Sequence, residues 1–195
     1  MANETEILGW LDQREGDMVA LLEEIVNIDS GSFNKAGVDA VQAVLQRHLD
    51  GNGIACETIA EETFGNCMRA LVSGSGGGGN RPILLMGHCD TVFPDGTVAE
   101  RPFRVENGRA YGPGVADMKA GLVINTFVLQ AFARAGAPVP LVGLYTADEE
   151  SASPSSRPVI EAEAQNARRI AGFADLDGIE FVARIDVGTD SNGEE

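Results

Sequence analysis

The residues best suited to chemistry are His88 and Asp90, a histidine and an aspartate separated by one position. They follow the apolar run 82–86 and Gly87, a pattern that predicts a buried strand ending at this pair. Side chains alternate between the faces of a strand, so His88 and Asp90 should share one face and Cys89 the other. An imidazole beside a carboxylate at the C-terminal end of a buried strand is typical of an active site in an open α/β sheet. A polar strand end on a solvated loop would give the same pattern.

Further acidic residues occupy comparable positions. Asp117 lies at the start of an expected helix, and Glu149 and Glu150 follow a second apolar run. Imidazole and carboxylate ligands without thiolates suit Zn, Mn or Co. Crowded carboxylates repel one another unless a cation neutralises them, and few Lys or Arg lie nearby in the sequence. The pattern therefore favours a metal site over a network of salt bridges.

The composition sets limits on the kind of protein. The chain has 195 residues, 44% of them hydrophobic and 23% charged, which is enough for one globular domain. A net charge of -16 predicts that neither nucleic acid nor an anionic membrane is a partner. No run approaches the roughly 18 apolar residues of a membrane span, and the acidic start at 1–6 lacks the features of a secretory signal. The odd number of cysteines (Cys56, Cys67 and Cys89) favours free thiols in a reducing compartment. We therefore expect a cytoplasmic location.

The elements that must position these residues are visible as apolar periodicities. Helices are expected at 4–27, 37–49, 119–135 and about 156–167, and strands at 54–60, 67–73, 82–88 and 139–145, with a short hairpin at 103–111. The alternation of strands and helices in the second half, with polar clusters after two strands, predicts an α/β sheet.

The glycine-rich segment 74–80 could be a phosphate loop or a flexible hairpin connection. No Gly-Lys-Ser/Thr follows it and no helix opens directly after it, so a hairpin connection is favoured. Three polar residues have plain structural interpretations: Asp148 as a turn residue, Lys119 as a surface residue at a helix start, and His48 as a surface histidine. Cys89 is expected to be a packed thiol rather than a nucleophile.

Three motifs resemble those of the zinc-dependent exopeptidase and deacylase family: GHCDTV at 87–92, YGPGVADMKAG at 111–121 and DEE at 148–150. They occur in the family's order, with spacings of 29 residues (88 to 117) and 33 residues (117 to 150). The family includes glutamate carboxypeptidase, acetylornithine deacetylase, succinyl-diaminopimelate desuccinylase and aminoacylase, and the run 151–157 looks most like the glutamate carboxypeptidase branch. The resemblance covers about residues 15–170. It implies a three-layer α/β sandwich with a mixed, mainly parallel sheet, incomplete at the C-terminus.

The resemblance also implies a site with two zinc ions, for which Co²⁺ or Mn²⁺ could substitute. His88 and Glu150 would each bind one zinc, and Asp117 would bridge both. Asp90 would hold the His88 ring in its ligating tautomer, as its position on the same strand face permits. Glu149 would be the general base that takes a proton from the attacking water and later gives one to the leaving amine. The implied activity is hydrolysis of amide bonds in peptides or N-acyl amino acids.

Two further ligands of the family's pattern follow the Glu-Glu pair. Asp175, at a spacing of 25 from Glu150, is the candidate for the acidic ligand, with Asp177 as the alternative. The second ligand, a histidine near the C-terminus of full-length members, has no counterpart. Residues 1–178 would be the N-terminal part of a catalytic domain, and 179–195 the first strand of the family's lid and dimerisation domain. The chain therefore looks truncated, and the homodimer of full-length relatives is not expected of it.

Two functional hypotheses follow. The chain is a metal-dependent amide hydrolase, or it is a catalytically inactive remnant or binding protein that keeps the fold and at most part of the metal site. The ligands and the base that are present favour the first, and the absent histidine and lid favour the second. The sequence leaves the substrate open, since the specificity contacts would lie in the lid.

Overall fold

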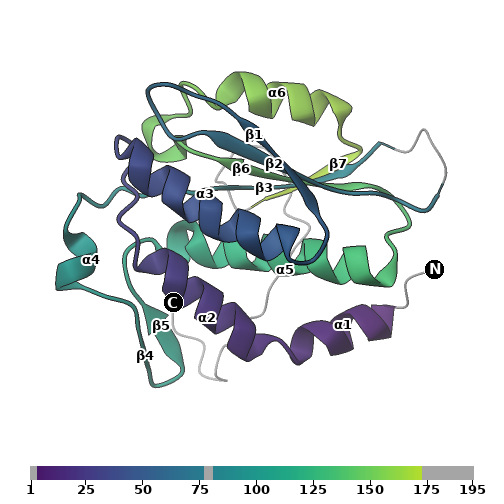
Figure 1. Ribbon diagram of the computed structural model, residues 1–195, viewed down its shortest axis with the longest axis horizontal. Coiled ribbons are helices and arrows are strands. Elements are labelled where there is room, and N and C mark those ends of the chain that lie inside the picture. Colours follow the sequence, from purple (N-terminus) through teal and green to yellow (C-terminus); the bar gives the residue numbers. More distant parts are fainter. Residues whose placement is uncertain (1–3, 77–80, 173–195) are drawn as a thin grey trace, which may run out of the picture.

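The computed structural model describes residues 4–76 and 81–172, and its centre is a five-stranded sheet between layers of helices (Figure 1). The strand order is β1 (Ala55–Ile59), β2 (Cys67–Val72), β6 (Leu141–Thr146), β3 (Ile83–His88) and β7 (Arg169–Gly172). β3 pairs in parallel with both β6 and β7, whereas β2 is antiparallel to β1 and to β6. The predicted α/β fold with a mixed, mainly parallel sheet is confirmed.

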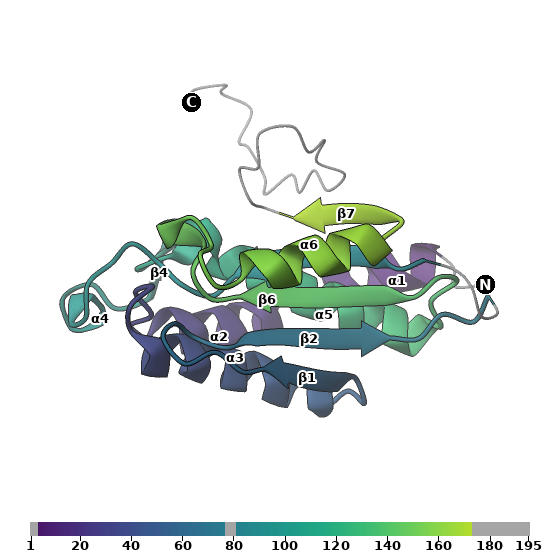
Figure 2. The ribbon, with the colours of Figure 1, turned by 90° about the horizontal axis from the view of Figure 1, so that it is seen from above.

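Helices cover both faces of the sheet. Figures 1 and 2 show α1 (Glu4–Asp12), α2 (Glu15–Val26), α3 (Lys35–Asp50) and α5 (Ala120–Ala135) on one side and α6 (Arg157–Asn166) on the other. Because successive side chains of a strand point to opposite faces of the sheet, each face has its own hydrophobic core. Residues that pack toward α6 are Leu84, Met86, Val142 and Leu144. The larger core, toward α2, α3 and α5, includes Leu85, Cys89 and Tyr145.

Shorter elements complete the fold. They are α4 (Thr97–Glu100), the hairpin of β4 (Arg104–Glu106) and β5 (Arg109–Tyr111), and two short turns of helix, η1 (Val115–Lys119) and η2 (Glu149–Ser151). The hairpin turn places Asn107 at φ 53° and Gly108 at φ 74°. Both are residue types that accept a left-handed backbone in a two-residue turn, so this predicted hairpin forms as expected.

Two of the expectations about the order and extent of the helices and strands are wrong. The predicted single helix 4–27 is two helices, α1 and α2, separated at Gln13 and Arg14, where the apolar spacing lapses between Leu11 and Met18. The break lets Trp10 lie with its ring centroid 6.2 Å from that of Phe127 on α5. The strands β2 and β3 do not form the hairpin that was expected on either side of 74–80, because β6 lies between them. Periodicity along the chain cannot show that a later strand inserts between two earlier ones.

One helical segment, Val115–Ala135, is long and apolar enough by composition to cross a membrane. Within the fold, 61% of its 18-residue window is buried. It packs as a core helix against the sheet and against α1, α2 and α3. Length and hydropathy here reflect burial inside the protein.

The cysteines are free thiols, as predicted. Cys89 is fully buried on the face opposite His88, and burial raises the pKa of its thiol. The predicted domain boundary at 178, the expected strand 179–195 and the candidate ligands Asp175 and Asp177 lie outside the described residues.

Candidate metal centre

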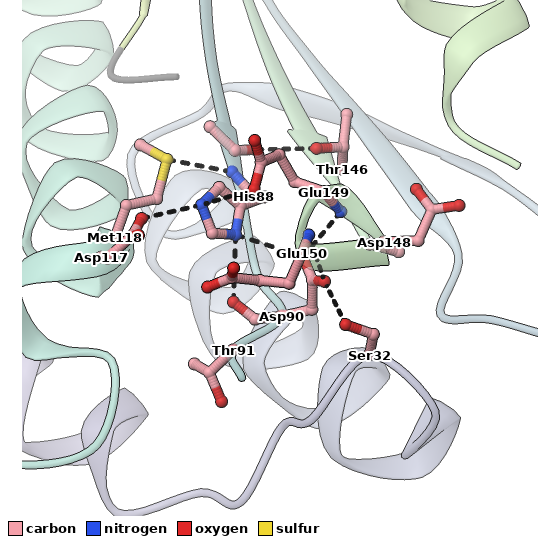
Figure 3. Close-up of polar contacts among 12 residues, drawn as sticks. Ser32, His88, Asp90, Thr91, Asp117, Met118, Thr146, Asp148, Glu149 and Glu150 are labelled. Atoms are coloured by element: carbon pink, nitrogen blue, oxygen red, sulfur yellow. Dashed lines mark hydrogen bonds and ion pairs between the residues drawn. The ribbon is translucent and has the colours of Figure 1, made fainter. Parts of the chain in front are cut away.

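Three segments meet at the C-terminal ends of the central strands (Figure 3). They are the loop after β3, the loop after β6 and the segment that leads into α5. His88 ends β3, and Thr146, its register partner, ends β6. Because the two strands are parallel, their C-terminal ends lie side by side and bring Asp90 close to Glu149 and Glu150. The five predicted site residues that the structure describes, His88, Asp90, Asp117, Glu149 and Glu150, are neighbours.

His88 is the buried centre of this group, with 2% of its surface exposed. Its Nδ1 lies 3.0 Å from the main-chain oxygen of Asp90 and 3.2 Å from Asp90 Oδ1. Its Nε2 lies 3.1 Å from Asp117 Oδ1 and 3.7 Å from Glu149 Oε2. Burial alone would lower the pKa of the imidazole, but the hydrogen bond and charge of Asp90, with Glu149 and Asp117, raise it to about 9.

Asp90 connects the His88 ring to the backbone of Glu149 and Glu150, and it is completely buried. Its Oδ1 accepts the N–H of Glu149 at 3.1 Å, and its Oδ2 accepts the N–H of Glu150 at 3.1 Å and the Ser32 hydroxyl at 2.6 Å. Burial would raise the pKa of this carboxyl, but the hydrogen bonds from His88 and Ser32 outweigh it and lower the pKa. An ionised Asp90 thus orients the imidazole and also fixes the backbone that carries both glutamates.

Asp117 enters the site from a kink in η1. Its φ of -121° and ψ of 102° are extended, and the Asp117–Met118 peptide is cis. The Asp117 carboxylate points toward His88, and the chain continues from this segment into α5 (Figure 3). The side chain is 71% exposed, so it lies at the solvent side of the cluster.

Three side chains offer a metal-binding arrangement. One ligand atom each from His88, Asp117 and Glu150 can be chosen so that all three lie within 4.8 Å of one another. Burial, followed by the nearby Asp117 charge, raises the pKa of Glu150. One imidazole nitrogen and two carboxylate oxygens suit zinc and related divalent ions, and a cation there would relieve the repulsion between the carboxylates. The residues therefore fit a metal ion.

Lys119 is not the surface residue that the sequence suggested. It is 1% exposed, and its Nζ donates to the carbonyl oxygens of Ile25 at 2.9 Å and Ile28 at 2.8 Å. Burial lowers the pKa of its ammonium group to about 8. The ammonium group satisfies carbonyls at the C-terminal end of α2 and ties that end to the segment that carries Asp117.

Replacing Lys119 with methionine is expected to lower the free energy of unfolding by about 1–3 kcal/mol, because one buried and one partly buried carbonyl would lose their donor. Urea denaturation followed by circular dichroism measures this loss. Lys35→Met is the matched control. The ion pair of Lys35 with Asp39, at 3.0 Å, is partly exposed, so its loss should cost less than about 1 kcal/mol. Equal losses in the two variants would contradict the structural role of Lys119.

Asp148 is a turn residue, as predicted, but it is also fully buried. Its carboxylate accepts the N–H of Ser155 at 2.6 Å and both the N–H and the hydroxyl of Ser156. Figure 3 shows this side chain turned away from His88. Asp148 therefore shapes the loop between β6 and α6 rather than joining the cluster.

Ser32 was missed as a contributor to the site. Ser32 lies between the helices expected at 4–27 and 37–49, and 58 positions separate it from the carboxylate that it contacts. No pattern in one sequence reports so distant a contact. His48, in contrast, is partly exposed on α3, with its Nε2 3.9 Å from Glu24 Oε2, as expected of a surface histidine.

The chain is similar in sequence to known proteins. The sequence model of Peptidase family M20/M25/M40 matches residues 84–192. Carboxypeptidase G2 of Pseudomonas sp. (strain RS-16) is 33% identical over 160 residues, which cover 80% of this chain and 38% of that protein. Acetylornithine deacetylase of Proteus mirabilis (strain HI4320) is 37% identical over 149 residues, or 71% of this chain and 37% of that protein.

Solved structures show the same fold. The crystal structure of human carnosine dipeptidase 1 matches with a TM-score of 0.74 at 18% identity, covering 88% of this chain and 41% of that one. The M20 family metallo-carboxypeptidase Sso-CP2 from Sulfolobus solfataricus matches with a TM-score of 0.65 at 19% identity, covering 80% and 36%. The chain thus spans about two fifths of the length of the relatives that it matches.

Proposed function

Because the chain belongs to Peptidase family M20/M25/M40, we propose that it acts as a metal-dependent hydrolase of amide bonds in peptides or N-acyl amino acids. Relatives named as a carboxypeptidase, a deacetylase and a dipeptidase support this class of substrate. The observation that carries the proposal is the group of His88, Asp117 and Glu150, whose ligand atoms converge within 4.8 Å next to Glu149.

His88, Asp117 and Glu150 would hold the ion, which we propose to be zinc. The Nδ1 of His88 faces two acceptor oxygens of Asp90 and keeps its proton there, so Nε2, which faces Asp117 and Glu149, is the nitrogen that would release its proton and bind the ion. A bound divalent ion would polarise the scissile carbonyl and lower the pKa of water. The family resemblance implies that Asp117 would also bridge to a second ion.

Glu149 is the proposed general base. Its carboxylate lies 3.7 Å from His88 Nε2, it is partly exposed, and it is not needed for the three-residue ligand group. From this position it can take a proton from the attacking water and deliver one to the leaving amine. Asp90 acts as a positioning residue, because it orients the His88 ring and binds the backbone N–H groups of Glu149 and Glu150.

Space for a substrate flanks the cluster. A cavity of about 350 Å³ is lined by His88, Glu149 and residues of α6, and another of about 440 Å³ reaches Glu150. Both volumes are of the size that small-molecule sites occupy. The test is hydrolysis of N-acyl amino acids and short peptides by the purified chain, beside zinc analysis. Bound metal without turnover would favour the alternative, a non-catalytic binding protein.

Zinc addition is expected to raise the melting temperature of the metal-free chain. At a free zinc concentration 100 times the dissociation constant, binding stabilises the folded state by about 2.7 kcal/mol, which is roughly 5–10 °C for a chain of this size. Differential scanning fluorimetry measures the shift. It should vanish in His88→Ala and persist in His48→Ala, which removes the other histidine. Loss of the shift in both variants, or in neither, would contradict a site at His88.

A further inference from the structure

A second feature of the site is the cavity of about 440 Å³ on the Glu150 side. Two loops form most of its lining, 31–34 and 91–95, together with Glu150 and Ser151. Glu150 belongs both to this lining and to the ligand group with His88 and Asp117. A molecule whose scissile bond lies at the cluster can therefore extend a neighbouring group into this cavity.

The cavity presents apolar side chains to solvent. Phe33 is 82% exposed and Val92 is 67% exposed, and Phe93 completes this part of the lining. Phe33 rests against Phe64 with 5.6 Å between ring centroids, yet most of its surface stays open. Single exposed apolar residues are ordinary. Two of the most exposed large hydrophobic side chains on one cavity next to the cluster make an apolar surface that a ligand can cover.

The two loops are held in place by hydrogen bonds that do not involve the apolar side chains. The carboxylate of Asp29 accepts the N–H groups of Gly96 at 2.7 Å and Val98 at 3.0 Å. Asn34 Nδ2 donates to Asp95 Oδ1 at 2.7 Å, and the N–H of Thr91 donates to the Ser30 carbonyl at 2.9 Å. A bound group would therefore meet a surface that is already ordered, so less conformational entropy is lost on binding.

Charge restricts what the cavity can accept. Its charged lining residues are Asp95 and Glu150, both acidic, and no Lys, Arg or His lines it among the residues that the structure describes. Arg101 stacks on Phe93, with its guanidinium carbon 5.1 Å from the ring centroid, but the lining itself offers an acidic side chain no cationic partner. Aromatic rings, in contrast, pair favourably with Phe33 and Phe93.

We propose that the cavity between loops 31–34 and 91–95 binds a neutral aromatic group of the substrate, next to the amide bond that is cleaved. The proposal rests on the proposed function, because it places that amide at the metal cluster. Substrates with a neutral aromatic group next to the cleaved amide should therefore bind this chain better than substrates with an acidic side chain at that position. An acidic group of a substrate would have to lie elsewhere.

The test is a ¹H–¹⁵N NMR titration of the whole chain, with and without zinc, using three amides: N-benzylacetamide, N-methylacetamide and N-acetylglutamate. N-Benzylacetamide should bind at least about ten times more tightly than N-methylacetamide, which corresponds to about 1.4 kcal/mol. Its shift changes should centre on the amides of 31–34 and 91–93. Phe33→Ala should remove the preference. Val105→Ala, which truncates an apolar residue of β4 that is 53% exposed, should keep it.

The outcomes separate the two proposals. The titration needs neither turnover nor metal, so localised binding of N-benzylacetamide by a chain without hydrolytic activity would support the aromatic site and count against the proposed function. Conversely, a chain that hydrolyses amides with equal kcat/KM for aromatic and small substrates, unchanged by Phe33→Ala, would overturn the aromatic site alone. Equal or tighter binding of N-acetylglutamate, or shifts centred elsewhere, would also overturn it.

Discussion

Replacing Glu149 with glutamine is expected to lower kcat for amide hydrolysis by about 10²- to 10⁴-fold while the zinc content stays unchanged. Glutamine keeps the size of the side chain, and the N–H of residue 149 still donates to Asp90. The amide oxygen, however, cannot take up a proton at neutral pH. Because Glu149 lies beside the ligand group rather than in it, the loss should fall on the chemical step.

Steady-state kinetics and zinc analysis on the same preparation measure the two parts of this result. Glu62→Gln, at an exposed position, is the matched control and should leave both quantities unchanged. If Glu149→Gln lost its zinc together with its activity, Glu149 would be a ligand instead. If kcat were unchanged, the base would have to be sought elsewhere.

The Asp90→Asn variant is expected to lose about 3–5 kcal/mol of unfolding free energy and about 10- to 100-fold in zinc affinity. Both carboxylate oxygens of Asp90 accept N–H donors, from Glu149 on one side and Glu150 on the other. An asparagine would direct its NH₂ group at one of these donors and leave that N–H without an acceptor. It would also remove the negative charge beside the buried His88 ring.

Urea denaturation and competition for zinc with a chromophoric chelator measure the two losses. Asp12→Asn, at an exposed position of α1, serves as the control. Should Asp90→Asn not fold, Ser32→Ala gives a milder test. It removes one hydrogen bond of 2.6 Å to Asp90 and should cost about 1 kcal/mol. Full stability and full zinc affinity in both variants would contradict the positioning role of Asp90.

The strand β3 and the polar residues at its end could be predicted from the sequence, because an apolar run, the alternation of side chains and a polar strand end are all local properties. Apolar residues 82–86 and the same-face relation of His88 and Asp90 follow from alternation alone. The convergence of Asp117 and Glu150 on His88 was predicted only through the spacing of the three family motifs. The structure brings these residues together at one sheet edge, while their roles as ligands and base stay predictions.

Contacts between segments that are distant in the chain could not be predicted from the sequence. Lys119 looked like a surface lysine because its acceptors are main-chain carbonyls more than 90 positions earlier, and carbonyls leave no trace in residue type. Ser32 gave no signal either, because the Asp90 carboxylate that accepts its hydrogen bond lies 58 positions later in the chain. The break between α1 and α2 and the place of β6 in the sheet are also decided by tertiary packing, which outweighs local propensity.

The place of β6 between β2 and β3 has a consequence for the order of assembly during synthesis. Residues 67–88 leave the ribosome with both of these strands, yet β2 and β3 have no bonds to each other in the finished sheet. Each must wait for residues 141–146 to form its ladder with β6. Asp90 likewise meets the N–H groups of Glu149 and Glu150 only after about 60 more residues have been added. The nascent chain therefore carries one unpaired edge of β2 and two unpaired edges of β3 until its second half arrives, and the candidate metal centre cannot assemble before Glu150 has been added.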